Sequence, residues 1–224
     1  MILSMNKERK YLSSFARRIS RKLSPYQKEL LDQFLPIVLF NQENFETVLK
    51  SYTQVKLEIG FGNGDHILAQ AIKNPETLFI GCEPYLNGVT RVLDDIENLN
   101  LKNILLYPDD ARNALEIIES GALQTVYILF PDPWPKNKQK KRRVINRETL
   151  SMIHGRLADE GELIIATDHK DYVRSILKDL DEIKLFKFKN ENIDLYKQPE
   201  GWVKTKYETK ALAGRSHYFL LIKQ

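Results

Sequence analysis

Acidic residues interrupt or follow several short apolar runs in the middle of this chain. Glu58 lies inside the run VKLEI, Glu83 directly follows LFIGC, and Asp110 ends the stretch ILLYPDD. A carboxylate that is buried without a partner costs free energy, so each of these acids needs a partner or a ligand. Three carboxylates in one place would repel a pyrophosphate and would suit a ligand with ribose hydroxyls and positive charge.

A turn with three glycines follows the run that contains Glu58: Gly60, Gly62 and Gly64. Asp65 stands where a dinucleotide-binding fingerprint needs its third glycine, and no Gly-Lys-Ser/Thr follows, so neither a dinucleotide site nor a P-loop is indicated. Glu83 lies about 20 residues beyond the turn, where an acid can accept hydrogen bonds from a ribose. Glycines at this point allow the backbone to turn tightly and to approach a ligand closely.

These acids have two interpretations. S-adenosyl-L-methionine carries a ribose, an ammonium and a sulfonium, and the whole set of acids beside a glycine turn favours it as the cofactor. In the alternative interpretation, Glu58 pairs with Lys56 or with a helix N-terminus, while Glu83 and Asp110 cap helices. For a single acid the second interpretation is the better one, and for the set we favour the cofactor.

The segment FPDPWP fixes one further acid. Asp132 stands between Pro131 and Pro133, which restrict the backbone on both sides and hold its side chain in place. Such preorganisation suits a residue that faces a reacting centre. Trp134 follows, and it could either stack on a base or pack against the core.

A basic tract begins immediately after this corner. Its cations are Lys136, Lys138, Lys140, Lys141, Arg142 and Arg143. A second basic cluster lies near the N-terminus, with Lys7, Arg9, Lys10, Arg17, Arg18, Arg21 and Lys22. A single run of this kind is usually a solvated face, but two runs, one beside a candidate site, indicate a nucleic-acid partner whose affinity falls with salt. The rigid corner and the tract together are typical of an enzyme that acts on a base within a nucleic acid.

Composition excludes several other classes of protein. No apolar run approaches the roughly 20 residues that span a bilayer, so no membrane segment is expected. Cys82 is the single cysteine, and with four scattered histidines, among them His169, no metal site is expected. The first residues are rich in Arg and Ser, which fits either an organellar transit peptide or a basic arm. Nothing indicates secretion, and the expected location is the cytoplasm.

From residue 55 onward, short strand patterns alternate with helical ones. Strands are predicted at Val55–Ile59, Leu78–Cys82, Asn103–Tyr107, Thr125–Phe130, Glu162–Thr167, Leu185–Phe188 and His217–Ile222. Helices are predicted near Asp65–Lys73, Val89–Leu99, Ala111–Glu119, Asn146–Leu157 and Asp171–Leu180, with an earlier helix starting at Ser24-Pro25. This alternation predicts a parallel sheet that helices cover on both faces. Ligands bind such sheets at the carboxyl ends of the strands, where Asp168 also falls.

The motifs resemble the bacterial tRNA (guanine-N7)-methyltransferases. The resemblance runs along most of the chain, through SFARRISRKLSPYQ, EIGFGNG, GCEPY, DDA, FPDPWPK, KKRR, TDHKDY and TKYE. It implies the Rossmann-like, doubly wound, mostly parallel seven-stranded sheet of the class I methyltransferases in residues 36–224, after a basic arm and helix in residues 1–35. It also weighs against a transit peptide, since the arm itself matches the family.

The resemblance implies a role for each matching residue. It places S-adenosyl-L-methionine against Glu58, Glu83, Asp110 and the three turn glycines, with Asp132 at both the cofactor and the reacting base. Substrate binding is implied for Lys136, Asp168, Thr205, Lys206, Tyr207 and Glu208, and RNA contact for Lys138, Lys140, Lys141, Arg142 and Arg143. The chain departs from the family pattern at Lys138-Gln139, which stands in place of Arg-His, at Ala211, which stands in place of a glycine, and at its C-terminal end, where no residue matches the family's aspartate.

The implied reaction transfers the methyl group of S-adenosyl-L-methionine to N7 of the variable-loop guanine at position 46 of tRNA. The partner is then tRNA, with no DNA and no membrane, and the oligomeric state is open between monomer and homodimer. One alternative is a methyltransferase acting on an amino or amide nitrogen, but such enzymes carry an Asn/Asp-Pro-Pro-aromatic motif. Another alternative is a non-catalytic RNA-binding protein with the same fold. A dinucleotide oxidoreductase is disfavoured by Asp65 and by the surplus of acids.

Overall fold

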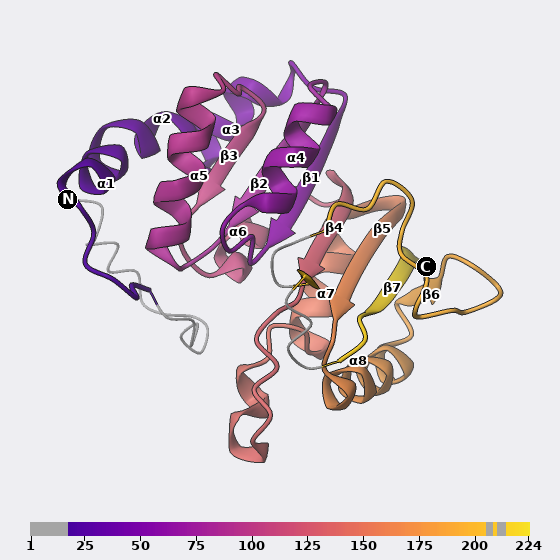
Figure 1. Ribbon diagram of the computed structural model, residues 1–224. Coiled ribbons are helices and arrows are strands. Elements are labelled where there is room, and N and C mark those ends of the chain that lie inside the picture. Colours follow the sequence, from indigo (N-terminus) through magenta and orange to yellow (C-terminus); the bar gives the residue numbers. More distant parts are fainter. Residues whose placement is uncertain (1–17, 205–207, 210–213) are drawn as a thin grey trace.

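A single sheet of seven strands forms the centre of the molecule (Figure 1). The computed structural model describes residues 18–204, 208–209 and 214–224. The strands are β1 (Gln54–Ile59), β2 (Thr77–Cys82), β3 (Ile104–Tyr107), β4 (Leu123–Leu129), β5 (Leu157–Thr167), β6 (Phe186–Phe188) and β7 (His217–Lys223). They lie in the order β3-β2-β1-β4-β5-β7-β6. The strands β1 to β5 run parallel, while β7 is antiparallel to both β5 and β6. The predicted mostly parallel seven-stranded sheet is confirmed.

The strands differ from their predicted limits mainly at the start of β5. Leu157 was predicted as the last residue of a helix, but it belongs to β5 and pairs with Leu123 of β4. Both side chains are fully buried, so tertiary packing overrides the helical pattern at this position. All six residues of β2 are buried, as expected for a parallel strand that is covered on both faces.

Five helices follow strands and cover the two faces of the sheet. They are α4 (Asp65–Lys73), α5 (Leu86–Asn98), α6 (Ala111–Ile117), α7 (Arg147–Arg156) and α8 (Lys170–Ile183). One core cluster joins α6, α7 and α8 to one face of the sheet, and a second joins α4 and α5 to β2 and β3 on the other face. The prediction of α4 is correct at both ends, and α5 begins three residues before the predicted Val89.

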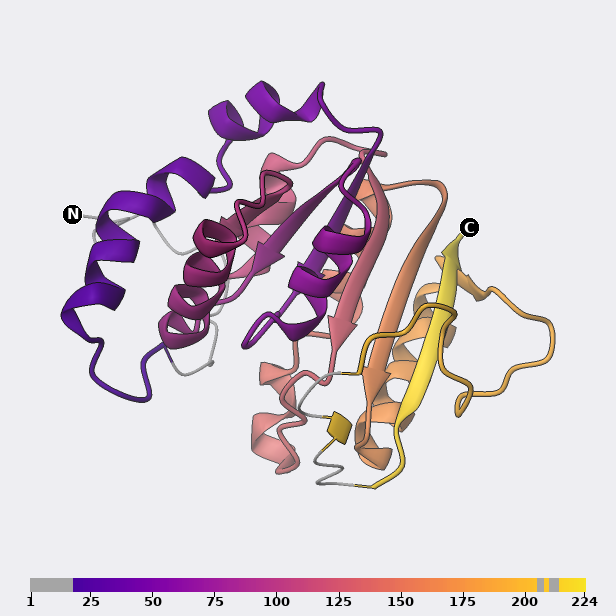
Figure 2. The same cartoon turned by 45° about the horizontal axis from the view of Figure 1, so that its top comes forward.

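Neither α4 nor α5 extends over the rest of this second face. Tyr127, Leu129, Ile164 and Tyr218 form a third core cluster there, on β4, β5 and β7, and Trp202 packs against them. Figure 2 shows the connection after β6, residues 189–204, crossing in front of these strands. On this second face, therefore, α4 and α5 cover the side around β1 to β3, and the connection covers part of β4, β5 and β7.

The N-terminal helical region begins as predicted. Ser24 caps α1 (Pro25–Glu29) in a complete capping box with Gln27. The chain continues through a π-helical turn (Leu30–Phe34) and α2 (Leu35–Val38), so the predicted boundary after residue 35 falls inside a helical region. A further helix, α3 (Gln42–Leu49), was not predicted. Among the described residues, no helix is both long and apolar enough to span a membrane.

Candidate functional site

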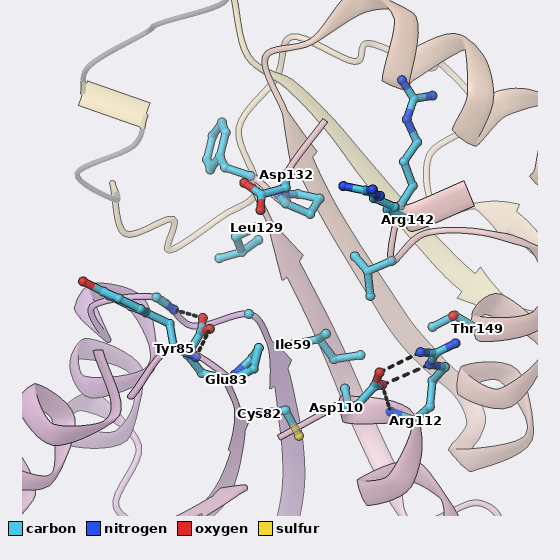
Figure 3. Close-up of a pocket in the computed structure, with 18 of the residues that line it drawn as sticks. Ile59, Cys82, Glu83, Tyr85, Asp110, Arg112, Leu129, Asp132, Arg142 and Thr149 are labelled. Atoms are coloured by element: carbon cyan, nitrogen blue, oxygen red, sulfur yellow. Dashed lines mark hydrogen bonds and ion pairs between the residues drawn. The ribbon is translucent and has the colours of Figure 1, made fainter. Parts of the chain in front are cut away.

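A cavity of about 480 Å³ opens at the carboxyl ends of β1, β2 and β4 (Figure 3). The strand order reverses between β1 and β4, and this switch point is where parallel sheets of this type bind ligands. The cavity brings together five residues predicted at the cofactor: Gly60, Gly62, Glu83, Asp110 and Asp132. Two others, Glu58 and Gly64, do not line it.

The glycine turn is shaped by close backbone packing. Gly60 has φ +78°, and a Cβ built there would meet nothing within 4 Å, because it would point into open space beside the cavity. On α5, a Cβ on Gly88 would lie 2.1 Å from the carbonyl oxygen of Gly62. Gly88 therefore lets the turn lie against α5, and only Gly fits this position. Sequence reasoning missed Gly88 because no motif marks it.

Glu83 is fixed by the protein backbone. Its Oε2 accepts from the backbone N–H of Gly62 at 2.8 Å, and its Oε1 accepts from that of Tyr85 at 2.9 Å. Burial raises the pKa of Glu83, and the two backbone donors oppose this shift. Each carboxylate oxygen keeps a lone-pair site for a further donor, such as a ribose hydroxyl.

Asp110 caps a helix and also lines the cavity, so the cap of the alternative interpretation is present and the acid stays accessible to a ligand. Its Oδ1 accepts from the backbone N–H of Arg112 at 3.0 Å, which caps α6. The Arg112 guanidinium donates to both carboxylate oxygens, at 3.0 Å from Nε and 2.6 Å from Nη2. Figure 3 shows Glu83 and Asp110 on one side of the cavity and Asp132 on the other. Arg112 also lines the cavity and was not predicted.

Glu58 has a protein partner of its own. It is 3% exposed, and its Oε2 lies 2.7 Å from Nδ1 of His66 in the first turn of α4. Its partner in the protein is therefore His66 and not Lys56. A buried carboxylate needs such a partner, and His66 provides it.

The corner that carries Asp132 is strained at both ends. Phe130 has φ +50° and Trp134 has φ +40°, and both are bulky side chains in a backbone region that favours glycine. The backbone N–H of Phe130 donates to the carbonyl of Ala166 at 2.8 Å, which ties the corner to β5. Strain of this kind persists where the surrounding structure enforces it, and it is concentrated at functional sites.

Asp132 projects at the mouth of the cavity and is exposed. Partial desolvation by the surrounding loops nevertheless raises its pKa. Within the described part of the chain, no hydrogen bond or ion pair holds its carboxylate. Unlike Glu83 and Asp110, this acid is placed by its backbone alone.

Trp134 lies between the cavity and the basic tract. It lines the cavity, and the Arg142 guanidinium lies 4.9 Å from its ring centroid. A cation over an indole at this distance is a favourable cation–π contact. The ring therefore belongs to the site rather than to the core.

The basic tract divides into an exposed and a buried part. It forms a 3-10 helix, Asn137–Arg142, and Lys136, Lys138 and Lys141 are exposed. Arg143 is only 3% exposed, so its predicted contact with RNA does not fit its position. Charged side chains become buried when they are paired, and Arg143 has its partners inside the protein.

Arg143 holds the strained corner. Its Nε donates to the carbonyl of Pro133 at 2.8 Å, its Nη2 lies 2.6 Å from Oδ2 of Asp171, and its guanidinium stacks over Tyr172 at 4.5 Å. Lys140 donates to the other oxygen of Asp171 at 3.0 Å. Hydrogen bonds from Arg143 and Lys140 lower the pKa of Asp171 to about 2. The end of the tract thus connects the corner to α8.

The described residues that were predicted at the substrate, Lys136, Asp168 and Glu208, lie outside the cavity lining. Lys136 is exposed beside the corner, Asp168 follows β5, and Glu208 contacts Trp202. Thr205, Lys206 and Tyr207 fall outside the described residues. No group of acids, histidines and cysteine among the residues that the structure describes is arranged to hold a metal.

The end of the basic arm reaches the cavity, which sequence reasoning did not predict. Ser20 lines it, with its Oγ 2.6 Å from the hydroxyl of Tyr85 and its backbone N–H donating to Asn87 at 3.1 Å. Arg18 pairs with Asp109 at 3.4 Å. These contacts place residues 18–20 over the side of the cavity that Glu83 forms.

The fold and the acids at its carboxyl edge define a class I methyltransferase. Among solved structures, a 16S rRNA methyltransferase, KamB, superposes with a TM-score of 0.59 at 15% identity, covering 83% of this chain and 95% of that one. A 30S ribosomal A1408 methyltransferase from an uncultured bacterium gives a TM-score of 0.51 at 21% identity, covering 83% and 94%. At these identities the likeness concerns the fold alone.

The sequence relatives identify the family. Residues 52–221 match the family model described as "Putative methyltransferase". A tRNA (guanine-N(7)-)-methyltransferase of Wolbachia pipientis is 38% identical over 92% of this chain and 89% of its own length. One of Caulobacter vibrioides is 36% identical over 93% of both. This chain belongs to the tRNA (guanine-N7)-methyltransferase family.

Some relatives are much longer. A bifunctional methyltransferase of Rickettsia conorii is 43% identical over 94% of this chain, which spans only 40% of that protein. Methyltransferases of this class generally use S-adenosylmethionine, and the hydrogen-bond acceptors and the space in the cavity fit it. Glu83 can accept from ribose hydroxyls, Gly60 leaves space, and the negative charges of Asp110 and Asp132 at the cavity suit a ligand that carries positive charge.

Proposed function

We propose that this chain transfers the methyl group of S-adenosyl-L-methionine to N7 of the guanine at position 46, in the variable loop of tRNA, and so forms 7-methylguanosine. One observation carries the proposal. The cavity at the switch point joins the acids of a cofactor site to a strained acidic corner, and a basic 3-10 helix leaves directly from that corner. Relatives that match this chain over most of both lengths are tRNA (guanine-N(7)-)-methyltransferases by name, which supports the same substrate.

Guanine N7 carries a lone pair and no proton, so the reaction needs alignment rather than a general base. When bound, S-adenosylmethionine supplies a sulfonium methyl group, which the N7 lone pair takes as the carbon–sulfur bond breaks. The guanine gains positive charge in this step. A fixed carboxylate at Asp132 stabilises that charge, or accepts from the N1 and N2 donors of the base. Alignment of this kind lowers the barrier by several kcal/mol, and by about 7 kcal/mol or more where the orientation is ideal.

The remaining residues bind and orient. Glu83 and Asp110 hold the cofactor, while Lys136, Lys138 and Lys141 bind phosphates of the tRNA. Residues 18–20 cover the cofactor side of the cavity through Ser20. With tRNA as its partner, the protein works in the cytoplasm.

The test is incubation of the protein with S-adenosylmethionine and unmodified tRNA that bears the variable-loop guanine, followed by mass spectrometry of the nucleosides. We expect 7-methylguanosine, and none from a matched tRNA in which adenine replaces that guanine. Cofactor binding measured by calorimetry separates the alternatives. Binding without product refutes the substrate assignment, a methylated amino group points to an amino-directed methyltransferase, and no binding points to a non-catalytic RNA-binding protein.

A further inference from the structure

The start of β7 lies at the same edge of the sheet as the cavity. His217, its first residue, pairs with Thr167, the last residue of β5. Because β7 is antiparallel to β5, its amino end lies beside the carboxyl end of β5, where Asp168 follows. A Cβ built on Gly214, shortly before β7, would lie 3.8 Å from the carbonyl oxygen of Asp168. Arg215 therefore leaves the backbone next to the loop after β5.

Arg215 is held in place by an aromatic ring. Its guanidinium carbon lies 3.8 Å from the centroid of the Tyr196 ring, close enough for a cation–π contact. The ring of Tyr196 is 43% exposed and lies 4.9 Å from that of His217, which is buried. The backbone N–H of Tyr218 donates to the carbonyl of Leu195 at 2.7 Å, which fixes this segment along β7. A buried ring thus supports a partly exposed ring, which in turn orients an exposed guanidinium.

The contact with the ring leaves the N–H donors of Arg215 without an acceptor atom. A guanidinium carries five such donors in one plane, and among the described residues none of them has a hydrogen bond or an ion pair. Because the ring fixes the orientation of this plane, less conformational entropy is lost when a ligand binds. Phosphate oxygens match the geometry of such a fork. Arg215 is thus an anion-binding group that is oriented in advance and has no anion within the described protein.

Two further cations without a partner lie near the start of α8. Lys170 and Arg174 are four residues apart, so they share one face of the helix, and both are exposed. Neither side chain has a hydrogen bond or an ion pair to any residue that the structure describes, whereas Lys178 on the same helix pairs with Glu182. The positive end of the helix dipole disfavours a cation at the first position of a helix, so the stability of α8 does not explain Lys170.

The basic tract is attached to the same turn of α8. Lys140 and Arg143 both bond Asp171, the second residue of α8. Figure 1 shows the 3-10 helix of the tract and α8 at the end of the sheet toward which β4 and β5 point. In the described part of the chain, side chains of this region that have no hydrogen bond or ion pair are therefore found on the tract, on α8 and at β7: Lys138, Lys141, Lys170, Arg174 and Arg215.

We propose that Arg215, on its Tyr196 support, binds a backbone phosphate of the tRNA, and that Lys170 and Arg174 bind neighbouring phosphates. The contacts of the RNA then extend from the tract across the ends of β5 and β7, instead of ending at the tract. This assignment rests on the proposed function, because the partner is the tRNA of that function. It adds a phosphate-binding surface on the β5 and β7 side of the cavity.

The test is the salt dependence of tRNA binding. The tRNA carries adenine in place of the variable-loop guanine, so that no methyl transfer at that site accompanies binding. Arg215→Gln removes the charge and keeps a polar side chain. We expect the Kd for tRNA to rise about threefold to tenfold at low salt, and the slope of log K against log salt to fall by about 0.7–0.9, the contribution of one phosphate contact.

Two further variants separate charge from support. The double variant Lys170→Gln with Arg174→Gln removes two charges, and its slope should fall by about twice as much as that of Arg215→Gln. Tyr196→Leu keeps the charge of Arg215 and removes the ring that orients it. We therefore expect a smaller rise in the Kd, about twofold to threefold, with an unchanged slope.

Lys187→Gln is the matched control. Lys187 is exposed on β6 and pairs with Ile222 near the carboxyl end of β7, so its charge lies at the opposite edge of the sheet. An unchanged slope in Arg215→Gln, or an equal fall in Lys187→Gln, overturns the proposal. A lower thermal unfolding midpoint of Arg215→Gln with an unchanged slope does so too, because the stack then serves stability alone. Failure of the proposed function is a separate result: the wild-type protein binds tRNA and forms no 7-methylguanosine from the guanine-bearing tRNA, while the slopes still decide whether Arg215 contacts a phosphate.

Discussion

The two acids that we propose bind the cofactor and the acid that we propose faces the reacting base are held in opposite ways. Glu83 and Asp110 have their oxygens bound by backbone N–H groups or by the Arg112 guanidinium. Asp132 has a strained backbone on both sides, and no described residue bonds its carboxylate. An acid whose oxygens accept from protein donors keeps a fixed position, and this suits the binding of a ligand that does not move during the reaction. A free carboxylate on a fixed backbone can respond to charge that develops during a reaction.

The largest effect should follow removal of the free acid. We expect Asp132→Ala to lower the rate of methyl transfer by about a hundredfold to a thousandfold, because the charge that offsets the developing cation is lost. Single-turnover kinetics at saturating cofactor and tRNA measure this rate directly. Asp159→Ala, which removes an exposed aspartate far from the cavity, is the control. An unchanged rate in Asp132→Ala would show that Asp132 does not stabilise the developing charge, and hence that its role does not differ from that of Glu83 and Asp110 in the way proposed.

The same assignment predicts a pH dependence. The pKa of Asp132 lies above the ordinary value of 3.8, because the loops around the cavity partly desolvate it. As the pH falls through that raised pKa, the carboxylate becomes protonated and the rate of methyl transfer should decline. Asp132→Asn keeps the size of the side chain and cannot titrate, so its lower rate should stay constant over that range. An acid limb that persists in Asp132→Asn would have to be assigned to another group.

Arg143 should have the next largest effect, on stability. It bonds Pro133 and Asp171 from a buried position, whereas Lys138 of the same tract is exposed. Loss of a buried ion-pair partner costs about 3–5 kcal/mol, and we expect about 2 kcal/mol for Arg143→Ala because the side chain of Asp171 is 40% exposed. Urea unfolding measures the difference. Lys138→Ala should leave the free energy of unfolding unchanged, and equal effects of the two changes would contradict the division of the tract.

A change at Glu83 tests the role of the acids whose oxygens accept from protein donors. In Glu83→Gln, one amide NH₂ must face the backbone N–H of Gly62 or Tyr85, and a donor then meets a donor. We expect the Kd for S-adenosylmethionine to rise about tenfold to a hundredfold, which corresponds to roughly 1.4–2.7 kcal/mol. Isothermal calorimetry measures the Kd, and Glu119→Gln, at an exposed position, is the control. A rise in Kd of the same size for Asp132→Asn would remove the contrast between the two acids.

Sequence patterns were sufficient for most of the sheet and for the side of the cavity where we propose that the cofactor binds. Parallel strands give continuous apolar runs, and an acid after such a run has only one edge of the sheet to occupy. Glu83 and Asp110 could be placed for this reason. Leu157 and α3 could not, because pairing with β4 and packing against the core decide their structure.

The contacts that were missed connect residues far apart in the chain. Arg143 looked like the rest of its tract, and only the position of α8 shows that it turns inward to Asp171. Ser20 and Gly88 belong to no motif, and their roles depend on how the arm and α5 approach the glycine turn. Local sequence reports propensity and periodicity, whereas contacts of this kind depend on the completed fold.

The smallest effect concerns the exposed lysines, and it sharpens the contrast with Arg143. Lys138→Ala and Lys141→Ala should each weaken tRNA binding at low salt by about 1 kcal/mol or less, with no change in the Kd for S-adenosylmethionine. Each should also reduce the slope of log K against log salt by about 0.7–0.9, the contribution of one phosphate contact. Binding titrations at several salt concentrations give the slope. Lys178→Ala, 74% exposed on α8, should leave it unchanged. If that control shifts the slope equally, the attraction for tRNA belongs to the overall charge rather than to the tract.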